Sequence, residues 1–326
     1  MVAGVSLVVP TRNAGAELRE ILPAMLDQDL PVPLEVLVID SGSTDGTVEL
    51  VRRSPARLLE IPPDEFDHGL TRALGVREAG GEVVCFATQD ARPFDRLWLR
   101  SLVECFDDPV VAGAYSCQLP RPDANPLIRE RLKRWAAGAA ERRVQRLADP
   151  AELERLQPLE RLERVAFDNV SSAVRRSVAL RIPFRQCRFG EDLDWAFRVI
   201  RAGHAIVFEP RSKVVHSHNR SMWYEFKRVF LDHAHLHDLL GVHTVPTFRS
   251  AAACTVSAFH DLRGVVERDE RLGRGARAAW KARCLPYAAT QNLAQYLGAA
   301  TARGRRGRTL RGRLFRGLHA LLAQGV

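Results

Sequence analysis

Short apolar runs alternate with segments of helical spacing over the first 120 residues, and this alternation restricts the fold more than any other feature. The runs Val5–Val9, Val36–Ile39 and Val83–Ala87 are rich in β-branched residues, as buried strands are. Between them, Glu17–Met25 and Leu70–Ala79 carry apolar side chains at helical spacing. Apolar strands that alternate with helices form a mostly parallel sheet flanked by helices. We therefore expect an α/β fold.

Polar clusters follow three of the expected strands, at the positions where each strand ends. They are Pro10–Asn13, Asp40–Ser43 and Thr88–Asp90. In open α/β sheets, ligands bind outside the carboxyl ends of the strands, where such clusters meet. The sequence therefore predicts one ligand site at this edge of the sheet.

Two aspartates in these clusters can bind a ligand. Asp40 can accept hydrogen bonds from a ribose hydroxyl or a base N–H, and the alternative is a helix-cap or turn aspartate. Asp90 can hold a magnesium or manganese ion against a diphosphate. The alternative for Asp90 is a solvated turn residue before Arg92.

Two further segments carry groups suited to phosphate or metal. Arg72 lies in an expected helix start, where free N–H groups and a guanidinium can bind phosphate oxygens; the alternative is a surface arginine. His216 and His218 follow the strand-like segment Lys213–Val215, and alternation along an extended chain places both imidazoles on one side. They can bind a metal or a phosphate, or they are two surface histidines.

Three carboxylates, those of Glu191, Asp192 and Asp194, lie within four positions ahead of the helical stretch Trp195–Ile200. Acidic residues in a first helical turn also interact favourably with the helix dipole, which is the alternative explanation. A carboxylate crowded by like charges has a raised pKa, as a general base requires.

The remainder of the chain has a different character. Residues 121–165 are expected to be mostly helical, residues 168–215 return to mixed α/β signals, and helices dominate beyond Trp223. We expect a domain at 1–220, with a nucleotide-binding half at 1–118 and an acceptor half at 119–220. A C-terminal helical extension with a basic amphipathic tail is expected at 221–326.

Net charge and amino-acid composition limit the classes of partner that the protein can bind. The net charge of +9 is compatible with nucleic acid, an anionic membrane surface or a phosphorylated substrate. Aromatic residues make up only 7% and are not interleaved with the basic ones, so we expect no nucleic acid partner. The six cysteines are scattered and there is no secretory-type leader or membrane-spanning apolar run, so we expect free thiols and a cytoplasmic protein.

Taken in order, these segments resemble the family-two inverting glycosyltransferases of GT-A fold, over roughly residues 4–240. SLVVPTRNAG and VIDSGSTDGT match the family's nucleotide-binding start. FDHGLTRALGVREAGGEVVCFATQDARP, DNVSSAVRR, PFRQCRFGEDLDWAFRVIRAGH and VVHSHNRS are similar to bacterial rhamnosyltransferases. A GT-A sheet, which is Rossmann-like, is what this resemblance implies.

The resemblance also implies a role for each matching residue. Asp192 would be the catalytic base. Asp90 would be the last aspartate of the family's DxD metal motif, completed by His216 or His218, and Thr88 replaces its first aspartate. The nucleotide-sugar-binding set would be Pro10, Arg12, Asp40, Arg72, Gln89 and Glu191. Because threonine is a poor metal ligand, we expect the ion to be held by Asp90, a histidine and the diphosphate itself.

The expected reaction is transfer of L-rhamnose from dTDP-rhamnose to a hydroxyl of a glycan or lipid-linked glycan, in one inverting displacement. The alternatives are a UDP-hexose donor and a non-catalytic membrane-surface adaptor that keeps the GT-A fold. A dinucleotide-binding oxidoreductase is excluded, because the turn after the first strand is PTRNAG and not GxGxxG.

The C-terminal tail has its own pattern. Residues 308–322 place leucines along one stripe of a helix, and residues 301–326 hold seven arginines and no acid. Such a helix can lie in an anionic membrane interface, as peripheral proteins do on the inner face of a cell membrane. The alternative is that the stripe packs on the protein's own helices.

Overall fold

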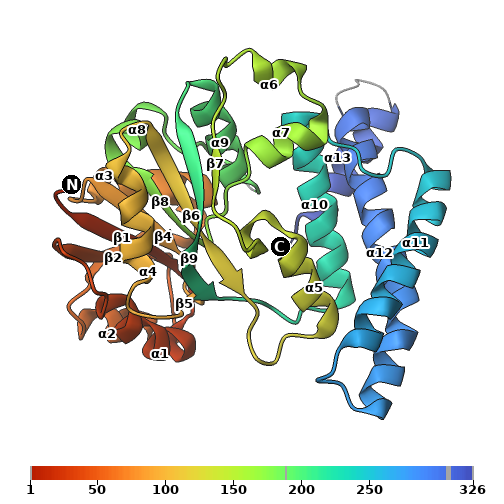
Figure 1. Ribbon diagram of the computed structural model, residues 1–326, viewed down its shortest axis with the longest axis horizontal. Coiled ribbons are helices and arrows are strands. Elements are labelled where there is room, and N and C mark those ends of the chain that lie inside the picture. Colours follow the sequence, from red (N-terminus) through yellow and green to blue (C-terminus); the bar gives the residue numbers. More distant parts are fainter. Residues whose placement is uncertain (1, 188, 306–309, 325–326) are drawn as a thin grey trace. The chain divides into compact units, whose positions relative to one another are not determined.

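The computed structural model describes residues 2–187, 189–305 and 310–324 (Figure 1). It divides into two compact units. The α/β unit comprises Met1–Pro122, Leu132–Leu156 and Glu163–Ser217. The helical unit comprises Asp123–Arg131, Gln157–Leu162 and His218–Val326.

One mixed sheet forms the centre of the α/β unit. Its strands are β1 Val5–Thr11, β2 Leu34–Asp40, β3 Arg57–Glu60, β4 Val83–Ala87, β5 Arg92–Pro93, β6 Val111–Leu119, β7 Arg143–Gln145, β8 Ser171–Arg175 and β9 Ala205–Val215. They follow the order β3-β2-β1-β4-β8-β6-β9-β5, and β7 pairs with β9. The first four strands are parallel, β8 is antiparallel to both of its neighbours, and β6 and β9 are parallel. The expected α/β fold is confirmed, with antiparallel pairs confined to the second half of the sheet.

The buried side chains of the parallel strands alternate between two cores. Leu7, Val38 and Cys85 point to the face that α1 and α4 cover. Val8 points to the opposite face, where it lies so close to Gly75 of α3 that no Cβ would fit at that glycine. Since both faces are covered, these strands are apolar at nearly every position, which is why they appear in the sequence as continuous runs.

Helices cover the sheet and match most of the expected positions. Those of the α/β unit are α1 Gly15–Leu26, α2 Thr47–Arg52, α3 His68–Glu78, α4 Trp98–Val103, α6 Glu152–Arg155, α8 Arg176–Arg181 and α9 Glu191–Arg201, with 3-10 turns at Pro63–Glu65, Glu104–Asp107 and Ala136–Gly138. Helix α7, Pro158–Arg164, lies partly in each unit. The helical prediction for residues 121–165 is wrong where β7 interrupts it. There the buried Gln145 bonds the Tyr115 hydroxyl and donates to the Ala166 carbonyl, so tertiary pairing overrides helix propensity.

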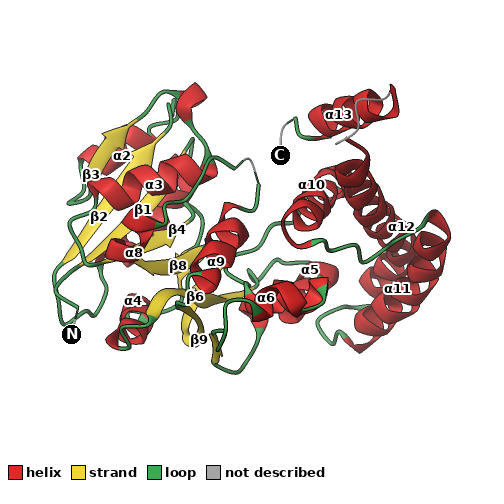
Figure 2. Cartoon of the chain, turned by 90° about the horizontal axis from the view of Figure 1, so that it is seen from above, coloured by secondary structure: helices red, strands yellow, loops and turns green. Residues whose placement is uncertain are grey.

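The helices of the C-terminal part of the helical unit are α10 Met222–Leu240, α11 Phe248–Arg268, α12 Arg274–Arg305 and α13 Leu310–Leu322, in the described part of the chain (Figure 2). Helix α5, Pro126–Arg134, contributes Leu127 to a small core with Val266 and Cys284. Gly298 lets α12 approach the backbone of α10 at Phe230. The expected helices beyond Trp223 are therefore present in the described part of the chain.

Two general features complete the fold. All six cysteines are described and each is free, as expected. Within the described residues, no helix combines the length and the apolar character needed to cross a membrane.

Candidate active site

Asp40 organises the loop after β2 and is completely buried. Its Oδ1 accepts from the N–H groups of Gly42 and Ser43 at 3.1 and 2.8 Å. Its Oδ2 accepts from the Ser43 hydroxyl at 2.5 Å and from the Thr11 hydroxyl at 3.0 Å. Four hydrogen bonds occupy the four lone-pair directions of a carboxylate, so Asp40 shapes the loop. Its contact with a nucleotide stays a prediction.

The ends of β1 and β4 are tied together by one side chain. The Arg12 N–H donates to Gln89 Oε1 at 2.8 Å, and Gln89 Nε2 donates to the Arg12 carbonyl at 3.3 Å. Pro10 is half-buried in β1, opposite Ile39. Asn13 has a φ of 50°, a left-handed conformation that asparagine tolerates. The Arg12 guanidinium is exposed beside this braced loop and free to approach a ligand.

Asp90, His216 and His218 form a possible metal site. One ligand atom from each lies within 4.8 Å of the other two, and Asp90 Oδ2 lies 3.5 Å from His216 Nε2. Ligands that share one ion lie about 2.0–2.2 Å from it, so a small closure would let all three bind. Arg121 lies 3.7 Å from the same Asp90 oxygen. The three residues expected to bind a metal therefore meet at the ends of β4 and β9.

Thr88, which replaces the first DxD aspartate, lies two positions before Asp90 in the chain. The Thr88 N–H donates to the Val170 carbonyl at 3.1 Å, which fixes the backbone. Its hydroxyl oxygen is buried and has no hydrogen-bond partner among the described residues. Since buried hydroxyls are nearly always bonded, the Thr88 hydroxyl is left with a hydrogen bond that a bound ligand could make. The donor set thus fits a divalent ion carrying an oxygen-rich ligand.

Arg72 and Glu191 form a buried ion pair. Arg72 Nη1 lies 2.9 Å from Glu191 Oε1, and both side chains are almost fully buried. Arg72 also donates to the His68 carbonyl, and Asn169 Nδ2 donates to Glu191 Oε1 at 3.1 Å. Burial raises the pKa of Glu191, but the positive charges of Arg72 and His68 and the hydrogen bond from Asn169 together outweigh it, so the pKa is lowered. Both residues were expected at the nucleotide-sugar site, and the structure shows them paired with each other.

Asp192 lies at the start of α9 and keeps part of its surface accessible. Its Oδ1 accepts from the Leu193 N–H at 2.8 Å, and its Oδ2 accepts from the Asn169 N–H at 3.4 Å. Burial raises the pKa of Asp192 well above its usual range, and the Glu191 and Asp168 carboxylates raise it further. A carboxylate with a raised pKa can accept a proton near neutral pH, which is the property required of a general base.

The acidic cluster at the start of α9 therefore separates into three roles. Glu191 pairs with Arg72, Asp192 faces other carboxylates, and Asp194 pairs with Arg198 one turn along the helix at 2.8 Å. Only Asp192 lacks an arginine partner among these three, within the described residues. The Asp194–Arg198 pair is local to the helix, whereas the surroundings of Glu191 and Asp192 come from other elements and are not visible in the spacing of the three acids.

Sequence reasoning missed the residues that support Asp192. Asp168 accepts from the Trp135 indole N–H at 2.8 Å and from the Val170 N–H at 3.0 Å. Asn169 donates both to Glu191 and to Asp192. The segment DNVSS matches the family, but the resemblance assigns no role to its residues. The polar pair Asp168 and Asn169 just before β8 is the sequence feature that could have indicated their part in the site.

Comparison with known proteins gives the family. The glycosyl transferase family 2 model matches residues 6–160. The O-antigen chain rhamnosyltransferase RfbN of Salmonella typhimurium is 32% identical over 231 residues, which cover 69% of this chain and 70% of that protein. The O-antigen chain rhamnosyltransferase WbaN of Salmonella anatum is 34% identical over 230 residues, with the same two coverages.

Solved structures agree on the fold. Staphylococcus aureus TarS 1–349 in complex with UDP superimposes with a TM-score of 0.52 at 14% identity, over 92% of this chain and 91% of that one. Glucosyl-3-phosphoglycerate synthase from Mycobacterium tuberculosis, in complex with Mn²⁺, UDP-glucose and glycerol 3-phosphate, gives 0.50 at 19% identity, over 74% of this chain and 81% of that one. The expected GT-A fold is confirmed. The chain belongs to glycosyl transferase family 2 and is a glycosyltransferase.

Proposed function

We propose that the protein transfers L-rhamnose from dTDP-rhamnose to a hydroxyl of a glycan or lipid-linked glycan, with inversion at the anomeric carbon. The observation that carries the reaction type is Asp192, a carboxylate with a raised pKa beside a buried Arg72–Glu191 pair. Support for the sugar comes from the two relatives, both named as O-antigen chain rhamnosyltransferases.

Asp192 would remove the proton from the acceptor hydroxyl as its oxygen attacks the anomeric carbon. Inversion in one displacement needs a base and no covalent nucleophile. Glu191 and Asp194 are each paired with an arginine, and Asp168 accepts the Trp135 indole N–H. Asp192 is therefore the carboxylate of this group that is best placed to exchange a proton.

Asp90, His216 and His218 would hold a divalent ion at the donor end of the site. Such an ion, when bound, neutralises charge on a diphosphate leaving group. Two imidazoles beside one carboxylate suit a transition metal better than Mg²⁺, which prefers oxygen ligands. We therefore propose Mn²⁺ ahead of Mg²⁺. Arg121, at 3.7 Å from Asp90, would add positive charge at the same place.

Thermal melting with nucleotide sugars tests the donor. We expect dTDP-rhamnose with Mn²⁺ to raise the melting temperature more than UDP-glucose or UDP-galactose at the same concentration, because a ligand stabilises the state that it binds. A larger shift with either UDP-hexose would contradict dTDP-rhamnose as the donor and favour that UDP-hexose, while the protein would still be a glycosyltransferase.

We also propose that the protein works at an anionic membrane surface. Residues 218–326 hold 18 basic and 7 acidic residues, whereas residues 1–217 hold 30 basic and 32 acidic, so the positive net charge lies in the C-terminal part. On α13, Leu314 and Leu321 are 67% and 62% exposed, while Leu322 is buried. The helix therefore packs through one part of its apolar surface and presents another to solvent. Arg308 and the other residues of 306–309 lie outside the described residues.

A further inference from the structure

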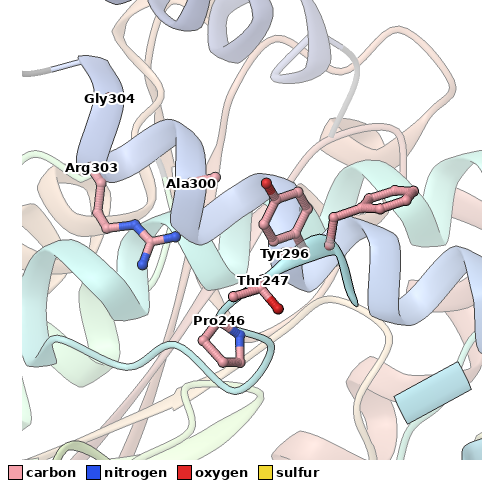
Figure 3. Close-up of a pocket in the computed structure, with 7 residues that line it drawn as sticks. Pro246, Thr247, Tyr296, Ala300, Arg303 and Gly304 are labelled. Carbon is pink, nitrogen blue, oxygen red and sulfur yellow. The ribbon is translucent and has the colours of Figure 1, made fainter. Parts of the chain in front are cut away.

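A pocket lies entirely within the helical unit, among its own residues (Figure 3). Its volume is about 430 Å³, within the range of small-molecule sites. The loop before α11 and the first residue of that helix form one wall, with Thr247 and Phe248. Helix α12 forms the other wall, with Tyr296, Ala300 and Arg303.

The hollow follows from the sequence of α12. Positions 296, 300 and 303 share one helix face, and the small Ala300 between the two long side chains leaves space above it. On the opposite face of the helix, Gly298 and Thr301 are buried. The pocket floor is thus part of a helix that is fixed by packing on its other side.

The loop wall is also anchored. Val245 is buried, and the Thr244 hydroxyl donates to Gln295 Oε1 of α12 at 2.7 Å. The Thr247 hydroxyl accepts from the Ser250 N–H at 3.0 Å and caps α11. Because both walls are held by their own contacts, the pocket needs little rearrangement to bind a ligand.

The lining combines a cation with aromatic rings. Arg303 is exposed, and no acidic side chain among the described residues forms an ion pair with it. Phe248 is 68% exposed, and its ring lies 6.3 Å from that of Tyr296, edge to face. A guanidinium binds phosphate through two parallel hydrogen bonds, and exposed aromatic rings pack against the C–H faces of a sugar.

We propose that this pocket binds a phosphorylated saccharide, with the phosphate on Arg303 and the sugar ring against Tyr296 and Phe248. The excess of 18 basic over 7 acidic residues in 218–326 favours an anionic ligand of this kind. The pocket uses neither Asp192 nor the metal residues. Binding there is therefore separate from the transfer reaction proposed above.

The test is calorimetric titration of the full chain with glucose 1-phosphate, in the presence of saturating dTDP and Mn²⁺ to occupy the donor site. We expect saturable binding that Arg303→Gln weakens about tenfold or more, since it removes a charged hydrogen-bond donor. Ala300→Met, which fills the hollow and keeps the arginine, is expected to weaken binding similarly. Arg274→Gln, an exposed arginine at the other end of α12, is the matched control and is expected to bind normally.

Comparison ligands define the chemistry and its source. Glucose and inorganic phosphate alone are each expected to bind more weakly than glucose 1-phosphate. The same titration with glucose linked to polyprenyl phosphate, presented in phosphatidylcholine vesicles, tests a lipid-borne sugar phosphate. If the pocket takes the lipid-borne form, Arg303→Gln is expected to weaken binding of this ligand more than binding of glucose 1-phosphate, and the reverse is expected for a free sugar phosphate. Equal affinity for glucose 1-phosphate in wild type, Arg303→Gln and Ala300→Met would overturn the proposal, as would absence of binding to any of the sugar phosphates. Donor-induced melting shifts, measured on the same variants, report the proposed transferase site independently.

Discussion

Asp192 and Asp194 are two positions apart on α9, yet their carboxylates have different neighbours. Asp194 is paired with Arg198, whereas Asp192 is held near Glu191 and Asp168, and its pKa is raised. Asp192→Asn is expected to lower the turnover about 10²–10⁴-fold, the usual effect of removing a general base, with donor binding nearly unchanged. Asp194→Asn is the matched control and is expected to keep most of the turnover.

The pH dependence gives an independent check on Asp192. A base acts only when deprotonated, so kcat/KM of the wild type is expected to fall as pH drops through the raised pKa of Asp192, above the usual range for aspartate. Glu191, whose pKa is lowered, stays ionised throughout that window. Wild-type turnover in Asp192→Asn, or an acidic limb that persists in it unchanged, would remove Asp192 from the role of base.

Asp90 is the residue whose removal tests the proposed metal site. Asp90→Ala removes one of three converging ligands, so we expect the affinity for dTDP in Mn²⁺ to fall at least about tenfold. The difference between titrations with and without Mn²⁺ is expected to shrink in the same variant. Asp29→Ala, at an exposed position before β2, is the control. Equal affinities with and without the ion, in wild type and variant alike, would mean that Asp90 holds no ion.

The start of α3 depends on one glycine. Asp67 caps the helix by accepting from the Gly69 and Leu70 N–H groups, and it also accepts from Cys187 at 3.3 Å. The Arg185 carbonyl occupies the space where a Cβ on Gly69 would lie, so the 185–187 segment rests directly on the helix start.

Gly69→Ala is therefore expected to push this segment away and to lower the free energy of unfolding by about 1–3 kcal/mol, as overpacking does. Urea denaturation measures the change. Gly275→Ala is the matched control, because open space surrounds that glycine within α12, and we expect no loss of stability there. Equal stability of the two variants would contradict the close packing of the segment on α3.

The elements also show how far sequence reasoning extends. The parallel strands β1, β2 and β4 are apolar on both faces, so their positions and the polar clusters after them could be predicted from local pattern. Strand β7 could not, because its three residues are held by long-range pairing with β9. The partners of Glu191 and Asp192 were equally hidden, since Asn169 and Arg72 come from other elements.

At the scale of the whole molecule, charge is divided unevenly along the chain. Residues 1–217 are nearly neutral and residues 218–326 strongly basic, with exposed leucines on α13. We expect the full chain to float with anionic vesicles at low salt and much less with neutral vesicles, because surface arginines each contribute on the order of 1 kcal/mol. Replacing both Leu314 and Leu321 by serine is expected to weaken flotation, and Val256→Ser, also exposed, is the control. A protein that stays in the soluble fraction with anionic vesicles would show that α13 serves only for packing.

The most direct measurement is donor hydrolysis followed by NMR, since it needs no acceptor and reports both the sugar and the stereochemistry. With Mn²⁺, the purified protein is expected to release rhamnose from dTDP-rhamnose faster than it releases hexose from UDP-glucose or UDP-galactose, and the first-formed sugar is expected to have the inverted anomeric configuration. Asp192→Asn, tested in parallel, is expected to lose this activity. Faster hydrolysis of a UDP-hexose, or release of rhamnose with retained configuration, would contradict the proposed reaction.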